Sequence, residues 1–231
     1  MKQEKRSIEQ LVDEQLSKWT FLSKEGKSEV AEPKPFITLS REPGTGGPEI
    51  ARRLSDQLKM SLLAGQITQQ LAESAQVNEK AIKAIIEKAI TKRDDWLTSL
   101  FETRHLWPDK FLFHLTKVIN TIKSHGNAVI LGLGAQYILP TDKTFRVRLI
   151  GSLESRVKRI MDARSCSRQI AEKYVTATET DRRAFIQKFF KADSSNPYDY
   201  DLIINMGSLS VDGAIETIIS AFEAWKKEKN L

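Results

Sequence analysis

The chain has 231 residues, of which 40% are hydrophobic and 29% are charged, values typical of a soluble globular protein with one sizeable core. No apolar run approaches the ~20 residues of a membrane-spanning helix, and the basic first residues precede no apolar segment, so neither a membrane partner nor a secretory signal is expected. The single cysteine, Cys166, excludes an internal disulfide and a cysteine-based metal site and favours a cytoplasmic location, while the net charge of +6 suits phosphorylated small molecules or nucleic acid.

Residues 1–35 predict a peripheral segment. An amphipathic helix is expected around residues 7–19, and residues 23–35 are charged and contain proline, which is typical of a linker. We therefore expect an N-terminal helix and linker over residues 1–35 and one α/β domain over residues 36–231.

The next stretch predicts a strand, a glycine loop and a helix. Residues 36–39 are aromatic, β-branched or apolar, and a Pro/Gly cluster ends the run, as at the end of a buried strand. Pro48 can take the first position of the following helix. Between them, residues 44–47 allow tight turns that aim several N–H groups into one hollow at a helix N-terminus. This geometry binds phosphate.

The loop departs from the usual phosphate-binding pattern, which reads G-x-x-x-x-G-K-[ST]. In the register that places Gly46 on the second glycine, Gly47 replaces the lysine and Pro48 replaces the hydroxyl residue. The backbone cradle is therefore expected without its charged partner and its metal ligand. A plain strand-to-helix turn is the alternative interpretation, but it needs only one glycine, so the cluster favours phosphate binding.

The rest of the chain alternates between helical and extended patterns. After a return toward the sheet over residues 59–65, a largely helical block is expected over residues 67–125. Strands are expected over residues 127–131, 145–150 and 200–205. Four residues with short hydroxyl side chains can cap the later helices: Ser152, Ser167, Thr178 and Ser210. The helix after the first of these caps is expected to turn its apolar residues inward: Leu153, Val157, Ile160 and Met161.

Strands joined by helical crossovers predict a parallel sheet flanked by helices, the doubly wound α/β class. In such a sheet, ligands bind beyond the carboxyl ends of the strands. The glycine loop lies at one such end, Gly132 and Gly134 follow a second strand, and Gly151 follows a third. We therefore expect these glycines to gather around one ligand site.

Several short motifs follow one another in a fixed order. They are Ser-Arg-Glu-Pro-Gly at 40–44, Gly-Leu-Gly-Ala at 132–135, Val-Arg-Leu-Ile at 147–150, Asp-Arg-Arg at 181–183 and Tyr-Asp-Leu-Ile-Ile-Asn at 200–205. In this order they resemble the cytidylate-kinase-like family of P-loop nucleoside monophosphate kinases. The resemblance covers about residues 36–225, and the ordered set, rather than any one motif, makes it specific.

The resemblance implies a three-layer P-loop NTPase domain whose parallel sheet binds the donor nucleotide. It implies a helical NMP-binding region over about residues 61–125 and a LID over about residues 152–195. The implied reaction transfers the γ-phosphoryl group of ATP to CMP or dCMP with Mg²⁺. Such chemistry needs in-line positioning, neutralised charge and excluded water, with little covalent help from the protein. Neither a membrane nor nucleic acid is expected as a partner.

The resemblance also implies roles for single residues. The positions expected to bind ATP lie in and just before the glycine loop: Ser40, Arg41, Gly44, Thr45, Gly46 and Gly47. The acceptor side is expected to include Gly132 and Gly134. The expected catalytic residues lie in the LID: Arg156, Arg159, Asp181, Arg182 and Arg183. Asp181 would orient one of these arginines, and no side chain is assigned to the metal. The alternative interpretation is that the arginines are solvated residues of amphipathic helices.

Further residues depart from the pattern of this family. Pro48 and Ala184 stand where arginines are often found, Ala64 where an aspartate is expected, and Leu133 interrupts an element that usually reads Gly-Arg-Gly-Ala. Each change removes charge from a site that binds phosphates. Besides an active kinase, a nucleotide-binding regulator or impaired kinase is therefore a second hypothesis. A third hypothesis is a nucleic-acid-binding module. Only the basic net charge supports it, because the sequence has no motif of such a module.

Overall fold

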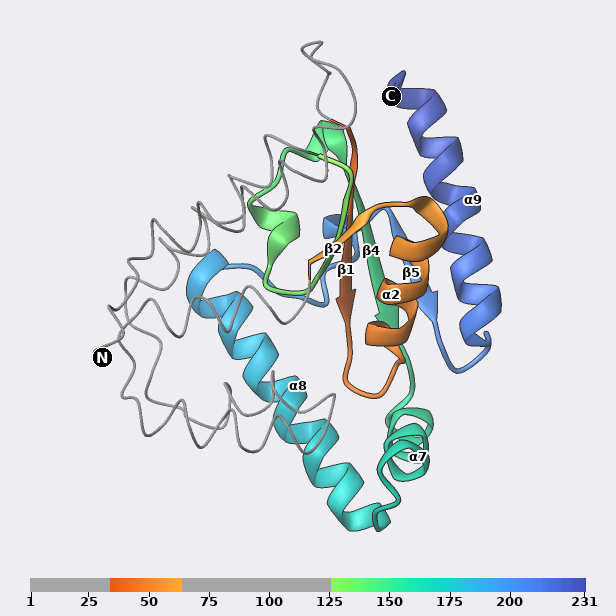
Figure 1. The fold of residues 1–231 in the computed structure, drawn as a ribbon. Coiled ribbons are helices and arrows are strands. Elements are labelled where there is room, and N and C mark those ends of the chain that lie inside the picture. The colour runs from red at the N-terminus through yellow and green to blue at the C-terminus, as the bar shows by residue number, and fades with distance from the viewer. Residues whose placement is uncertain (1–33, 64–125) are drawn as a thin grey trace, which may run out of the picture.

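The computed structural model describes residues 34–63 and 126–231 (Figure 1). The helix predicted over residues 7–19, the helical block predicted over residues 67–125 and Ala64 lie outside these ranges. In the two described ranges, no helix combines the length and the apolar character that crossing a membrane requires.

Five parallel strands form one sheet in the order β2-β3-β1-β4-β5. Their bounds are Phe36–Arg41 for β1, Ser61–Leu63 for β2, Ala128–Leu131 for β3, Thr144–Ile150 for β4 and Leu202–Asn205 for β5. Strand β1 is central, because Phe36 lies opposite Ala128 on one side and Thr144 on the other. The predicted parallel sheet is confirmed, and the carboxyl ends of its strands lie at one edge.

Both faces of the sheet are covered, because the central strands are apolar on both sides. Ile37 and Leu39 join one core cluster, while Phe36 joins a second cluster, as the two-residue period of a strand requires. Helices α2 (Gly47–Leu58) and α9 (Val211–Lys229) contribute to the first cluster. The turn η1 (Ala135–Tyr137) and the second half of helix α8 (Arg168–Phe190) contribute to the other (Figure 1). The predicted three-layer class is therefore confirmed.

Beyond the carboxyl ends of the strands, helix α7 (Leu153–Arg164) packs against the first half of α8 (Figure 1). Val157 of α7 shares a small core cluster with Ala171 and Val175 of α8. Two short turns, η2 (Thr141–Lys143) and η3 (Pro197–Asp199), precede β4 and β5. The segment predicted as a LID is thus next to the edge where a ligand is expected.

Three of the four predicted helix caps are confirmed. The side-chain oxygens of Ser152, Ser167 and Ser210 each accept a hydrogen bond from the backbone N–H three residues later, at 3.2, 3.4 and 3.1 Å. Thr178 does not cap a helix, because it lies fully buried in the middle of α8. Residues 171, 175, 178, 185 and 186 form one buried stripe, and this continuous packing keeps the helix unbroken.

The prediction that Leu153 faces inward is also wrong, since 40% of this residue is exposed. Leu153 is the first residue of α7, and the apolar contacts of this helix with α8 begin one turn later, at Val157. Ile160 and Met161 are partly buried against the same cluster. The periodicity of α7 therefore predicts which face of the helix is buried, but it does not predict where along α7 the contact with α8 begins.

Candidate phosphate-binding site at the carboxyl ends of the strands

The segment between β1 and α2 is a tight loop that glycine makes possible. Gly44 and Gly46 have left-handed backbone conformations, with φ of +85° and +81°, which residues with side chains rarely adopt. Thr45 between them is buried, and its hydroxyl donates a 2.8 Å hydrogen bond to the carbonyl oxygen of Glu42. The hydroxyl of Thr45 is therefore used to close the loop.

This loop presents backbone N–H groups that have no partner. In the described part of the chain, no backbone or side-chain acceptor binds the N–H groups of residues 44–47, and Pro48 has none. The first hydrogen bond of α2 runs from the N–H of Ile50 to the carbonyl oxygen of Gly46, at 3.1 Å. Unpaired donors at a helix N-terminus, together with the helix dipole, attract an anion. The loop thus has the geometry of a phosphate cradle.

Arg41, the last residue of β1, extends past the start of α2 to the end of β3. A Cβ atom at Gly47 would lie 2.8 Å from the Cγ of Arg41, and one at Gly132 would lie 2.0 Å from its Nη1. At both positions a side chain would require Arg41 to move, so glycine leaves the space that Arg41 fills in this structure. The Nε of Arg41 is buried and has no hydrogen-bond partner in the described structure.

Arg182 of α8 lies beside Arg41. Its Nη1 donates a 3.2 Å hydrogen bond to the backbone carbonyl oxygen of Arg41, and its own Nε is buried without a partner in the described structure. Burial and the neighbouring charge of Arg182 lower the pKa of Arg41, and burial lowers the pKa of Arg182 to about 10, although Tyr174 and the carboxylate of Glu179 act in the opposite direction. Two neighbouring cations repel each other unless an anion joins them. The fold therefore brings these two predicted residues together where an anion would relieve their repulsion.

Arg159 of α7 reaches the loop from the other side. A Cβ atom at Gly46 would lie 2.9 Å from the Nη1 of Arg159 and 3.7 Å from a methyl group of Val211, at the start of α9. Among the residues that the structure describes, no carboxylate pairs with Arg159. This predicted residue therefore brings a positive charge to the loop.

Glu42 in the loop has cationic neighbours on two sides. Its carboxylate accepts a 3.0 Å hydrogen bond from the backbone N–H of Gly151 and lies 3.4 Å from the Nε of Arg156. Its other oxygen lies 3.7 Å from Nη2 of Arg148. The loop is thus tied to β4 and to the start of α7.

Glu179 of α8 extends this ion-pair network. It lies 2.9 Å from Nη1 of Arg156 and 2.6 Å from Nη2 of Arg183. Arg156 is buried, so two carboxylates balance its charge inside the protein. The predicted catalytic roles of Arg156, Arg183 and the neighbouring Asp181 stay predictions.

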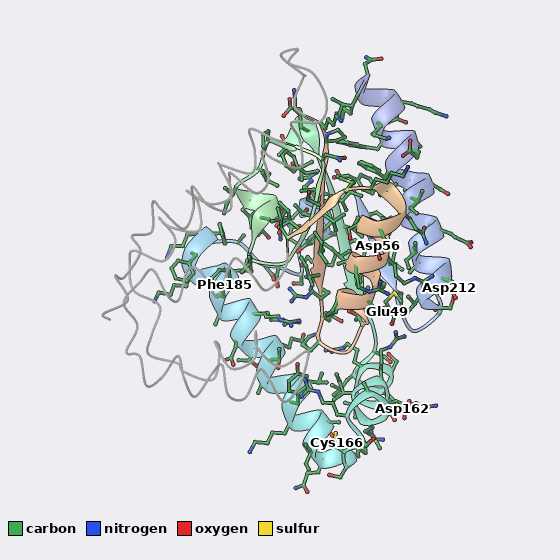
Figure 2. The ribbon with its side chains drawn as sticks, in the orientation of Figure 1. Glu49, Asp56, Asp162, Cys166, Phe185 and Asp212 are labelled. Atoms are coloured by element: carbon green, nitrogen blue, oxygen red, sulfur yellow. The ribbon has the colours of Figure 1, made fainter. Side chains whose placement is uncertain are left out.

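The Gly-Leu-Gly element after β3 turns sharply through consecutive left-handed residues. Gly132, Leu133 and Gly134 have φ of +77°, +63° and +66°. A Cβ atom at Gly134 would lie 2.2 Å from the ring of Phe190, so the packing of α8 requires this glycine. Leu133 packs against the apolar cluster that contains Phe185 together with Phe36 and Ile130 of the sheet; Figure 2 labels Phe185 in the second half of α8.

Sequence reasoning missed a hydrogen-bond network behind the loop. The buried Arg148 of β4 donates to the hydroxyl oxygens of Ser40, at 3.2 Å, and Tyr200, at 3.3 Å. Tyr200 in turn donates to the carbonyl oxygen of Ser194, at 2.8 Å. A buried arginine in a central strand needs such partners, and Arg148 within residues 145–150 was the available signal. Ser40, predicted to bind ATP, is a member of this network.

The parallel sheet and the glycine loop that follows its first strand are those of the P-loop kinase fold. The chain belongs to the cytidylate kinase-like family, whose model matches residues 36–208. A cytidylate kinase from Archaeoglobus fulgidus is 25% identical over 192 residues, which are 82% of this chain and 96% of the relative.

Solved structures with the same fold include an uncharacterized protein from Eubacterium ventriosum. Its TM-score is 0.58 at 21% identity, and the alignment covers 83% of this chain and 99% of that chain. A shikimate kinase from Acinetobacter baumannii aligns with a TM-score of 0.46 at 14% identity, over 84% of this chain and 95% of its own.

Proposed function

We propose that this protein transfers the γ-phosphoryl group of ATP to CMP or dCMP in the cytoplasm. One observation carries the proposal: four consecutive N–H groups, at residues 44–47, have no acceptor among the described residues and lie at the carboxyl ends of the strands, with Arg41, Arg159 and Arg182 beside them. Among described residues, none of these arginines has a carboxylate partner. Such a surplus of donors and positive charge suits a polyphosphate, and the family and its cytidylate kinase relative support the nucleotide class.

In this mechanism the chain positions phosphates and neutralises their charge. The N–H groups of residues 44–47 bind donor phosphate oxygens. Arg159, at Gly46, and Arg182, beside Arg41, carry the charge that develops as the phosphoryl group moves to the acceptor. The acceptor approaches from the side of β3, where Gly132 and Gly134 lie.

The described residues fit polyphosphate better than they fit a metal ion. Among them, no three His, Cys, Asp or Glu side chains gather as a metal-binding group, and Pro48 replaces the hydroxyl that would follow a P-loop lysine. Mg²⁺, which supplies charge neutralisation in phosphoryl transfer, would therefore be held by oxygens of the nucleotide and by water.

We assign Arg156 and Arg183 to holding the LID, the predicted segment over residues 152–195. Through Glu42 and Glu179 they connect the loop, α7 and α8, and closure of such a segment excludes water from phosphates. Figure 2 shows Cys166 at the end of the α7–α8 pair that lies far from the sheet.

A second candidate function is nucleotide binding with little or no phosphoryl transfer. Leu133 favours it, because this residue packs into an apolar cluster at a position where the family pattern has an arginine. Calorimetry would then detect ATP binding in a protein that turns over no monophosphate.

The experiment is a coupled assay of ADP formation with ATP, Mg²⁺ and each of the common nucleoside monophosphates, with the products separated by anion exchange. We expect CDP or dCDP to form, and Arg159→Gln to lower kcat by about 10²–10³. Arg52→Gln, on the exposed side of α2, is the matched control and should retain full activity. Folded wild-type protein that binds ATP but phosphorylates no monophosphate would reject the kinase and leave the second candidate.

A further inference from the structure

The loop lacks the lysine of a P-loop, and another side chain lies where that lysine would begin. Gly47 occupies the lysine position. A Cβ atom built there would lie 2.8 Å from Cγ, 3.2 Å from Cβ and 3.4 Å from Cδ of Arg41. The aliphatic part of Arg41 therefore passes directly over Gly47, and a lysine at this position would displace it.

The charged end of Arg41 lies farther along the same edge. A Cβ atom at Gly132 would be 2.0 Å from its Nη1, 3.2 Å from its Cζ and 3.7 Å from its Nη2. Gly132 directly follows β3 and precedes Leu133, which stands where the family pattern has an arginine. Arg41 thus spans the two places where charge is missing, from the donor loop to the acceptor side.

Among the described residues, no carboxylate pairs with the positive charge of Arg41. Its Nε is buried without a partner in the described structure, and the neighbouring charge of Arg182, another cation, lowers its pKa. In contrast, Glu42, the next residue, pairs with Arg148 and Arg156 and not with Arg41 in the described structure. A merely structural buried arginine would be balanced by a carboxylate.

We infer that Arg41 supplies the phosphate-binding charge that the P-loop lysine supplies elsewhere, reaching the site from β1 instead of α2, with Gly47 and Gly132 kept small to admit it. This inference rests on the proposed function for the identity of its ligand, the phosphates of ATP. In this interpretation the missing lysine at position 47 is compensated, because Arg41 supplies the positive charge and Gly47 leaves room for it.

The exchange can be tested with variants that reverse it. Arg41→Gln removes the charge and keeps part of the stem, Arg41→Lys restores a charge, and Gly47→Lys adds the missing lysine while Arg41 is present. Arg41→Ala/Gly47→Lys rebuilds the ordinary arrangement. Binding of ATP and of inorganic tripolyphosphate is measured by calorimetry, kcat by the coupled assay and folding by thermal unfolding, with Arg52→Gln as the matched control.

We expect Arg41→Gln to weaken binding of both ligands about 10- to 100-fold and to lower kcat by about 10²–10³. Its Tm should equal or exceed that of the wild type, because a repulsion with Arg182 is removed. Arg41→Lys should recover part of the loss. Gly47→Lys should impair the wild-type background, yet improve the Arg41→Ala background at least about tenfold, which is a positive coupling between the two positions.

Two results would overturn the inference: Arg41→Gln that binds tripolyphosphate as tightly as the wild type, or Gly47→Lys acting equally in the presence and absence of Arg41. Either result leaves the proposed kinase standing if the wild type phosphorylates CMP or dCMP. Conversely, a wild type that binds tripolyphosphate through Arg41 but transfers no phosphoryl group rejects the proposed kinase and supports the inference. Failure of the wild type to bind either ligand rejects both.

Discussion

Two sets of arginines lie at the same edge of the sheet, and they differ in what balances their charge. Arg148, Arg156 and Arg183 pair with Glu42 or Glu179. The second set, which we call the unpaired set, consists of Arg41, Arg159 and Arg182. Among the described residues, no carboxylate pairs with a member of the unpaired set. We propose that the paired arginines hold the protein together and that the unpaired set binds a phosphate ligand.

The largest effect should come from the unpaired set. Replacing Arg182 by Gln should lower kcat by about 10²–10³, because a partly buried cation beside the proposed phosphate site is removed. The Tm should not fall, because Arg182 has no carboxylate partner among the described residues and lies beside another cation. Steady-state kinetics and thermal unfolding of the same samples give both values. A drop in Tm with unchanged kcat would show that Arg182 stabilises the fold and does not contribute to catalysis.

The arginines that pair with Glu42 or Glu179, which we call the paired set, should affect stability more than activity. Arg156→Met should lower the free energy of unfolding by about 3 kcal/mol, because it leaves Glu42 and Glu179 without their shared partner in a largely buried place. Urea unfolding followed by circular dichroism measures the loss. Arg156→Lys is the matched control and should recover part of the stability. Wild-type stability in Arg156→Met would show that this network contributes nothing to the fold.

A ligand should satisfy the unpaired set and so stabilise the protein. Inorganic tripolyphosphate at 100 times its Kd should add about 2.7 kcal/mol to the free energy of unfolding, which corresponds to roughly 5–10 °C in Tm for a chain of this size. The shift should shrink in Arg159→Gln and persist in Arg156→Lys. Thermal unfolding at several concentrations measures it, and equal shifts in both variants would contradict the division into two sets.

The smallest effect is expected at a solvent-exposed ion pair, where Arg53 of α2 pairs with Asp212 of α9. Figure 2 shows Asp212 near Glu49, which also pairs with Arg53. Because Asp212 is 70% exposed, Arg53→Ala should cost at most about 1 kcal/mol of stability and leave kcat unchanged. A loss of activity in this variant would extend the functional surface to the outer helices.

Much of the fold follows from local sequence patterns. The strands β1 and β3 begin with or consist of short apolar runs, β4 alternates apolar and polar residues, and the Ser caps of α7, α8 and α9 are read from single positions. Thr178 has the same chemistry as these caps but lies inside α8, because tertiary packing overrides a local preference. Such an outcome depends on contacts far away in the sequence.

The sequence predicts which residues belong to the candidate site, but it does not predict which of its arginines pair with carboxylates. The glycine loop and the arginines of the LID are visible in the motifs, whereas the carboxylate partner of each arginine is not. Glu42 and Arg156 are distant in the sequence and meet only because the loop packs against the start of α7. The contact of Arg41 with Gly47 and Gly132 likewise depends on the sheet order, which places β3 beside β1.

The most direct test of the phosphate cradle is an amide NMR titration of the ¹⁵N-labelled protein with ATP. The largest shift changes should fall on the amides of Gly44, Thr45, Gly46 and Gly47, and inorganic tripolyphosphate should reproduce them without the nucleoside. Saturation with ATP that leaves these four amides unmoved would contradict the account.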